Sequence, residues 1–104
     1  MTNRTASRTD ANQAAIVDIY RGYGISVACT HAAGDGFPDL VLGVGNRNYM
    51  VEIKNGDLPP SKRKLTPDQV EFHRDWKGSI SIIETEHQAH DHARKILLMA
   101  ANRE

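Results

Sequence analysis

Two apolar runs joined by a tight-turn sequence constrain the fold of this chain more than any other feature. Residues 40–42 are typical of a buried strand, residues 45–48 of a tight turn, and residues 49–54 of a returning strand. Because a short turn reverses the chain, the two strands are expected to pair as a hairpin. Any fold of this chain should therefore contain that hairpin.

Charged residues stand at one end of the predicted hairpin. Asp39 opens the first strand, and Glu52 and Lys54 close the second. Side chains alternate along a strand, so Glu52 and Lys54 share a face with Met50, where Asp39 can converge on them. Ionised carboxylates at the edge of a core call for a positive partner, and a hard cation with oxygen ligands is a natural one. The same residues would also suit a solvent-exposed strand face, with Asp39 merely opening its strand.

Length and composition limit the class of protein. A chain of 104 residues forms one domain, and its 13 basic residues balance 13 acidic ones, which gives no general reason to expect a nucleic-acid partner. Cys29 is the only cysteine, so an intrachain disulfide and a cysteine-rich zinc site are excluded. Residues 1–10 are polar and are expected to be flexible. No stretch resembles a signal peptide or membrane helix, so a soluble cytoplasmic protein is expected.

The remaining periodic segments predict an α/β fold. Helices are expected over residues 12–23, from 66 to about 77, and over 86–101, and further strands over 26–30 and 80–83. The order is helix, three strands, helix, strand, helix. A fourth strand reached through a helix suggests a crossover connection, so the sheet should be mixed, four-stranded and flanked by helices.

The charged residues of the hairpin also resemble a known motif. Pro38-Asp39, followed by Glu52-Ile53-Lys54 on the next strand, resembles the PD-(D/E)xK nuclease superfamily, over about residues 10–83. Residues 10–13, 36–40, 52–54 and 65–69 are similar to small phage and prophage nucleases of the VRR-NUC group and to archaeal-type Holliday junction resolvases. The resemblance implies a restriction-endonuclease-like core.

The resemblance also implies a catalytic site. Asp39 and Glu52 would be carboxylate ligands of Mg²⁺, for which Mn²⁺ would substitute, and the carbonyl of Ile53 would add a third protein oxygen. Lys54 would orient the attacking water or stabilise the transition state. Gln69, on the helix that follows, would face the active site and position water or phosphate.

Two residues have alternative roles that the sequence leaves open. Gln69 lies where a capping box with Thr66 would place it, so it is either an active-site residue or a helix cap. Many members of the wider superfamily carry a glutamate on the first helix, where this chain offers Asn12 and Gln13. Asn12 is therefore expected to act as a helix cap.

The concentrated positive charge lies close to the predicted site. Lys62, Arg63 and Lys64, together with Arg47 in the hairpin turn, would contact a phosphate backbone. An ordinary exposed loop is the alternative for each residue taken singly. No interleaving of aromatic residues with these charges suggests a stacking platform for single strands.

Histidines add a further set of candidates. His31 is expected to be a polar loop residue, with contact to the scissile phosphate as the alternative. His73 is expected to pack beside Trp76, with a hydrogen bond near Gln69 as the alternative. A cluster on the last helix suggests a metal site at first sight, but its neighbours Ala89 and Ala93 point inward. The cluster is expected to be a solvated face, and it consists of His87, His90, Asp91 and His92.

The function expected from the sequence is that of a magnesium-dependent DNA endonuclease acting on Holliday junctions or other branched DNA in phage recombination. It would work in the cytoplasm, that of a bacterial host if the chain is phage-encoded. Two symmetric nicks require two active sites, so a homodimer is implied. One alternative is a general or nicking phage nuclease on flap, linear or single-stranded DNA. Another is a non-catalytic nucleic-acid-binding module.

Overall fold

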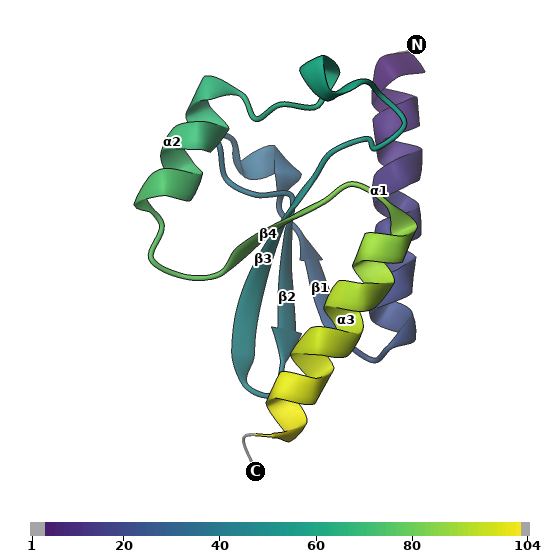
Figure 1. Cartoon of the computed structure of the whole chain (residues 1–104), viewed down its shortest axis with the longest axis vertical. Coiled ribbons are helices and arrows are strands. Elements are labelled where there is room, and N and C mark those ends of the chain that lie inside the picture. The colour runs from purple at the N-terminus through teal and green to yellow at the C-terminus, as the bar shows by residue number, and fades with distance from the viewer. Residues whose placement is uncertain (1–3, 103–104) are drawn as a thin grey trace.

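A four-stranded mixed sheet, seen in Figure 1, forms the centre of the molecule. The computed structural model describes residues 4–102, with side chains from Asn12 onward. Two short 3₁₀ turns, His31–Ala33 and Pro60–Lys62, lie in the connections. The helices and strands are α1 (Arg4–Gly22), β1 (Ser26–Cys29), β2 (Leu40–Val44), β3 (Arg47–Ile53), α2 (Pro67–Asp75), β4 (Ile80–Ile83) and α3 (Glu86–Ala101).

The strands are arranged in the order β1-β2-β3-β4. The first three pair antiparallel, and β4 pairs parallel to β3 after the chain has passed through α2. Gly45 and Asn46 both have positive φ, 59° and 64°, as the turn of a two-residue hairpin requires. Arg47 therefore already belongs to β3, opposite Val44. The expected α/β class, with a mixed sheet and flanking helices, is confirmed.

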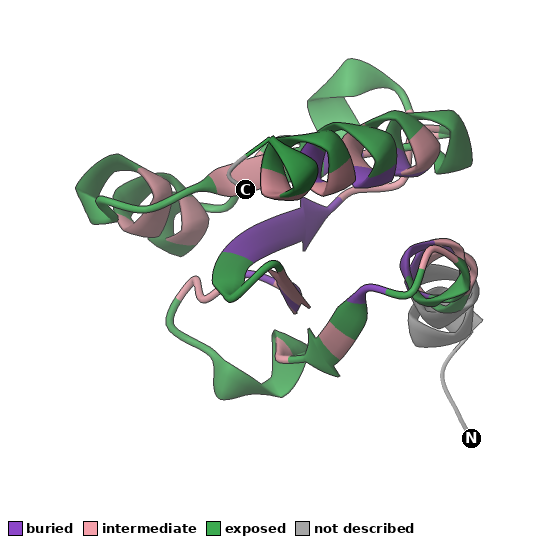
Figure 2. Cartoon of the chain, turned by 90° about the horizontal axis from the view of Figure 1, so that it is seen from below, coloured by how far each residue is buried: buried purple, intermediate pink, exposed green. Residues whose placement is uncertain are grey.

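The hydrophobic core lies between one face of the sheet and the helices α1 and α3. Figure 2 shows the buried residues on β3 and on the inner sides of these two helices. Alternate residues of β2 and β3 face this layer, as the strand period of two dictates. The fully or nearly buried members are Ile16, Val17, Tyr20, Ile25, Leu40, Leu42, Tyr49, Val51, Ile53, Ile83, Ala89, Ala93 and Ile96.

The opposite face of β3 is covered as well. Met50 is 9% exposed and Glu52 only 1% exposed, although both point away from the main core. The alternative that Glu52 and Lys54 form a solvent-exposed strand face is therefore wrong for Glu52. Among the described residues, Glu52 is the one charged side chain that is buried to this degree.

Helix α1 is longer than the sequence periodicity indicated. It begins at Arg4 rather than at Asn12, because residues 4–11 lack the spaced apolar residues that mark a helix face. Asn12 is therefore an interior helix residue, and its expected role as a cap is wrong. The expectation of a flexible start over residues 1–10 includes residues 1–3, which lie outside the described part. No helix within residues 4–102 is long and apolar enough to cross a membrane.

Two histidines of α3 join this helix to its neighbours. The hydroxyl of Tyr20 is hydrogen-bonded to Nδ1 of His92 at 2.7 Å, and that of Tyr23 to Nδ1 of His90 at 2.8 Å. Nε2 of His92 lies 3.3 Å from the Ser81 hydroxyl on β4. The expected solvated face is wrong for these two histidines, because Tyr20 on α1 and Tyr23 just after it contact them.

The other polar residues of this helix are exposed as expected. His87 and Asp91 have side chains 83% and 58% exposed and lie 3.3 Å apart. Thr85 caps the helix by accepting a hydrogen bond from the Gln88 N–H at 3.1 Å. The histidine cluster thus divides into an exposed pair and two interhelical contacts.

Candidate active site

The register of the hairpin brings the two proposed carboxylates together. Leu40 pairs with Val51, so Asp39, which precedes Leu40, lies opposite Glu52, which follows Val51. Residues opposite each other on antiparallel strands share one face. Oδ2 of Asp39 also accepts a hydrogen bond from the Ile53 N–H at 2.7 Å, which fixes this carboxylate against the end of β3.

Burial and the neighbouring carboxylate change the ionisation of Glu52. Its pKa is raised to about 8, first by burial and then by the hydrogen bond and negative charge of Asp39, while the charge of Lys54 acts in the opposite direction. Two carboxylates this close do not both ionise without compensation. In the absence of a cation the pair therefore keeps a proton at neutral pH. A divalent cation would replace that proton, and this is the electrostatic property expected of a metal site.

Gln69 links the second carboxylate to the lysine. Its Nε2 donates to Oε2 of Glu52 at 3.0 Å, and its Oε1 accepts from Nζ of Lys54 at 2.7 Å. The same Oε1 accepts from the Thr66 N–H at 2.9 Å, and the Thr66 hydroxyl accepts from the Gln69 N–H at 3.2 Å. The capping role is therefore confirmed. Gln69 completes a capping box and also holds Glu52 and Lys54 in place.

A glycine allows the loop of Asp39 to reach the start of α2. Gly36 has φ of 79°, and a Cβ atom there would lie 2.3 Å from the carbonyl oxygen of Asp68. Only glycine fits this contact, for both the backbone conformation and the space. The contact brings the loop that carries Asp39 against the turn that carries Gln69.

His73 also lies at the candidate site, closer to the alternative of a position near Gln69 than to the expected packing role. Its Nε2 lies 3.7 Å from Oε1 of Glu52, and neither atom has a hydrogen-bond partner among the described residues. Burial and the charge of Lys54 lower the pKa of His73, which keeps its imidazole neutral at pH 7. The sequence signal was the spacing from Gln69, since residues four apart lie on the same helix face.

The donor set fits a hard divalent cation held by few protein ligands. Asp39 and Glu52 supply carboxylate oxygens, and Oε1 of Glu52 is a buried acceptor without a hydrogen-bond partner in the described part of the chain. The carbonyl of Ile53 belongs to the same strand end. Within residues 4–102 no group of three or more His, Cys, Asp or Glu side chains is arranged to hold a metal ion. An ion at this site would depend on two carboxylates, a backbone oxygen and water, as Mg²⁺ commonly does.

Helix α1 is attached to the same strand end. The side-chain amide of Asn12 donates to the backbone carbonyl of Lys54 at 3.4 Å. Nε2 of Gln13, the next residue, lies 3.4 Å from Nδ1 of His31. His31 is an exposed loop residue, as expected. Asn12 therefore holds the backbone of Lys54.

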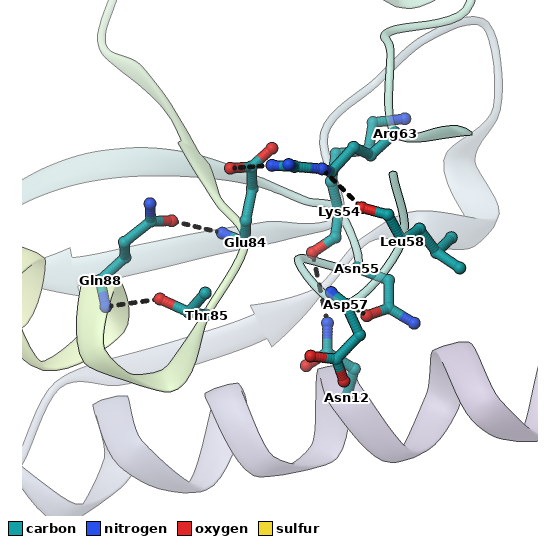
Figure 3. A network of polar contacts seen from close by, with 9 residues as sticks. All are labelled: Asn12, Lys54, Asn55, Asp57, Leu58, Arg63, Glu84, Thr85 and Gln88. Atoms are coloured by element: carbon teal, nitrogen blue, oxygen red, sulfur yellow. Dashed lines mark hydrogen bonds and ion pairs between the residues drawn. The ribbon is translucent and has the colours of Figure 1, made fainter. Parts of the chain in front are cut away.

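The basic loop, residues 62–64, consists of one arginine with structural contacts and two exposed lysines. The guanidinium of Arg63 donates to Oε1 of Glu84 at 3.0 Å and to the carbonyl of Leu58 at 2.9 Å, as Figure 3 shows. Lys62 and Lys64 on either side are exposed. Arg63 thus anchors the loop, and the two lysines are the residues whose charge faces solvent close to the end of β3.

Arg47 is not brought to the site. It is the first residue of β3, five positions before Glu52, and at 3.3 Å per residue this separates the two by about 17 Å. The hairpin turn and the open ends of a hairpin lie at opposite ends of its strands, as Figure 1 shows. The expectation that Arg47 supplies positive charge near the site is therefore wrong.

An aromatic row runs along the outer side of α2. The rings of Phe37 and Phe72 meet edge to face at 5.3 Å, and Phe72 stacks on Trp76 at 5.3 Å. Trp76 is 44% exposed and lines a groove of about 360 Å³ together with Phe72 and carboxylates. The sequence reasoning found no such aromatic row because Phe37 and Phe72 are far apart in the chain. The carboxylates of the groove are those of Asp35, Asp68, Glu71 and Asp75.

The acidic groove limits the direction from which DNA would approach. Carboxylates repel phosphates. Among the described residues, Arg74 is the cation beside this group, 3.7 Å from Glu71 and 2.8 Å from Asp75. A phosphate backbone would therefore approach from the side of Lys62 and Lys64 rather than over the outer side of α2.

Comparison of the chain with protein-family models, with curated proteins and with solved structures gives no match.

Proposed function

We propose that this chain is a magnesium-dependent DNA endonuclease that hydrolyses phosphodiester bonds. The observation that supports the proposal best is the buried Glu52, opposite Asp39 and joined to Lys54 through Gln69. A fully buried carboxylate with a raised pKa beside a second carboxylate is costly for the fold, and such groups concentrate at functional sites.

Each residue has a chemical role in this proposal. Asp39, Glu52 and the carbonyl of Ile53 would hold Mg²⁺, which neutralises phosphoryl charge and lowers the pKa of an attacking water. Lys54 would place its ammonium group beside the phosphate and stabilise the negative charge of the transition state. Gln69 would keep Lys54 and Glu52 at a fixed separation, since its amide binds both side chains.

Branched DNA is the substrate that we propose, on the resemblance to Holliday junction resolvases. Lys62 and Lys64 support a phosphate-backbone contact without base readout, which suits recognition of DNA shape. Symmetric cutting of a junction needs two copies of the site, so the active form would be a homodimer.

The experiment uses labelled four-way junction, flap, linear duplex and single-stranded DNA, each with Mg²⁺, Mn²⁺ or a chelator. Asp39→Ala and Lys54→Ala are the test variants, and Asp91→Ala, on the exposed side of α3, is the matched control. Metal-dependent cutting that both test variants lose and the control keeps is the expected result. If the wild-type protein cuts no DNA with either metal, or if Asp39→Ala cuts as fast as the wild type, the proposal is contradicted.

The same experiment separates the alternatives. Paired symmetric nicks in the junction, with duplex spared, identify a resolvase, whereas cutting of flap, linear or single-stranded DNA identifies a general or nicking nuclease. Binding of DNA without cutting indicates a non-catalytic module. Light scattering tests the dimer separately, and a monomeric mass at assay concentrations contradicts it.

A further inference from the structure

Two residues of α2 reach the two oxygens of one carboxylate. Gln69 Nε2 donates to Oε2 of Glu52 at 3.0 Å, and Nε2 of His73 lies 3.7 Å from Oε1. Gln69 and His73 are four residues apart, so they extend from the same helix face. The helix therefore contacts both sides of the buried carboxylate.

The contact on the His73 side differs from that on the Gln69 side. A separation of 3.7 Å is too long for a hydrogen bond. Both atoms are buried, and neither has another hydrogen-bond partner among the described residues. A buried polar atom without a partner costs about 1–3 kcal/mol. One water molecule that lies between two such atoms can form a hydrogen bond with each of them.

We propose that His73 is a positioning residue of the candidate metal site, whose Nε2 accepts a hydrogen bond from a water molecule of the ion's hydration shell beside Oε1 of Glu52. This inference rests on the proposed function. An imidazole nitrogen that carries no proton has the lone pair that such a hydrogen bond requires. His73 acts through Glu52 and water and does not touch the phosphate. Hydrogen bonds of this kind orient ligands and raise metal affinity.

The first test uses the wild-type protein and needs no substitution. Imidazole ¹⁵N chemical shifts are recorded by NMR while Mg²⁺ is added to saturation. Nε2 of His73 is expected to shift with the same dependence on Mg²⁺ as the backbone amides of β3, while the exposed His87 stays unchanged. A His73 resonance that does not move while those amides do overturns the inference.

The second test measures the dissociation constant of Mn²⁺ by electron paramagnetic resonance. His73→Phe keeps an aromatic ring of similar size and is expected to weaken binding by about 10- to 100-fold. His73→Gln, which retains an acceptor, is expected to recover most of the affinity, and His87→Phe, the matched control on α3, to change nothing. Circular dichroism melts of each variant confirm that the fold is retained.

The outcomes separate this inference from the proposed function. Unchanged Mn²⁺ affinity in a folded His73→Phe protein overturns the role of His73 and leaves the endonuclease proposal standing. Equal loss in His73→Phe and His73→Gln also overturns it, because the ring and not the acceptor would then matter. A wild-type protein that binds neither Mn²⁺ nor Mg²⁺ overturns both proposals together.

Discussion

At the scale of single residues, the amide of Gln69 has two tasks that substitutions can separate. Thr66→Ala removes the cap hydroxyl and is expected to cost about 1 kcal/mol of stability while the contacts of Gln69 to Glu52 and Lys54 remain. Gln69→Ala removes cap and contacts together. Nuclease rates and urea unfolding of both variants are the measurement. We expect a large loss of cleavage only in Gln69→Ala, and equal cleavage in the two variants would show that capping is the sole role.

Glu52 gives the folded protein a distinctive pH dependence. Its pKa is raised from 4.5 to about 8 in the folded state, so the folded protein binds the proton more tightly than the unfolded chain does. The stabilisation of the folded state by this bound proton is fully present below pH 4.5 and is lost as the pH rises through 8. Glu52→Gln, which stays neutral, should remove this fall.

Urea unfolding between pH 5 and 8.5 with a chelator measures this effect. The wild type is expected to lose stability toward pH 8.5 and the Glu52→Gln variant to lose less. Adding Mg²⁺ should restore the wild type and leave the variant unchanged, because the ion would take the place of the proton. Parallel pH profiles of the two proteins would contradict the prediction.

At the scale of elements, the contact between the loop of Asp39 and α2 depends on Gly36. Gly36→Ala places a Cβ atom 2.3 Å from the Asp68 carbonyl oxygen and strains a backbone with φ of 79°. Gly34→Ala is the matched control, because Gly34 has φ of 78° but no atom within 4 Å of a Cβ. Both variants should lose about 1–3 kcal/mol from strain.

Only Gly36→Ala should in addition lose cleavage, since the collision separates Asp39 from the helix of Gln69. Thermal melts and cleavage rates of the two variants check this prediction. A loss of cleavage that is the same in both variants would mean that strain alone, and not the contact with α2, matters.

The contact between α1 and α3 has its own pH dependence. Burial and the charge of Lys95 lower the pKa of His92, so its contribution to stability is present above pH 6.5 and is lost as the pH falls through the lower pKa of the folded state.

Tyr20→Phe removes the 2.7 Å hydrogen bond to His92 and is expected to cost about 1 kcal/mol at pH 7.

Chemical denaturation between pH 4.5 and 7.5 measures the contribution of His92. His92→Gln should flatten the acid side of the stability profile, whereas His87→Gln, at an exposed position of the same helix, should leave it unchanged. If the His92→Gln variant loses as much stability at acid pH as the wild type, another group causes the loss.

Local signals predicted several elements closely. Thr66 and Gln69 located the start of α2, since a capping box needs only neighbouring residues. β4 and α3 have the expected bounds, and the hairpin is present, with a turn shorter than the expected residues 45–48. Asp39 and Glu52 could therefore be placed opposite each other from the sequence.

The parts of the site that depend on tertiary structure could not be predicted in this way. The approach of His73 to Glu52 depends on how α2 docks. The edge-to-face contact of Phe37 with Phe72 joins two segments that are far apart in the chain. The wrong expectation for Arg47 did not depend on tertiary structure. The length of β3 alone would have placed it about 17 Å from Glu52.

At the scale of the whole molecule, the charge distribution predicts how affinity for DNA depends on salt. Lys62 and Lys64 are exposed on either side of Arg63, which is bound to Glu84 just after β4, whereas Arg47 lies at the turn end of β3. Each lost phosphate contact reduces the slope of log affinity against log salt by about 0.9 for duplex DNA. The double variant Lys62→Ala/Lys64→Ala should therefore lower the slope by about 1.8 and Arg47→Ala by almost nothing. Fluorescence anisotropy from 50 to 300 mM salt measures both, and equal slopes would contradict the assignment.

Helix α2 has no buried residue, although it carries Gln69 and His73. A segment with so little buried surface opens at a lower free energy than the sheet and exchanges its amide hydrogens sooner. We therefore expect the docking of α2 to be a local equilibrium that is separate from global folding. Trp76, the chain's single tryptophan, stands at the end of this helix and gives a fluorescence signal of its docking. Binding of an ion at Glu52 would favour the docked state of α2, so the proposed site would become more ordered as the ion binds.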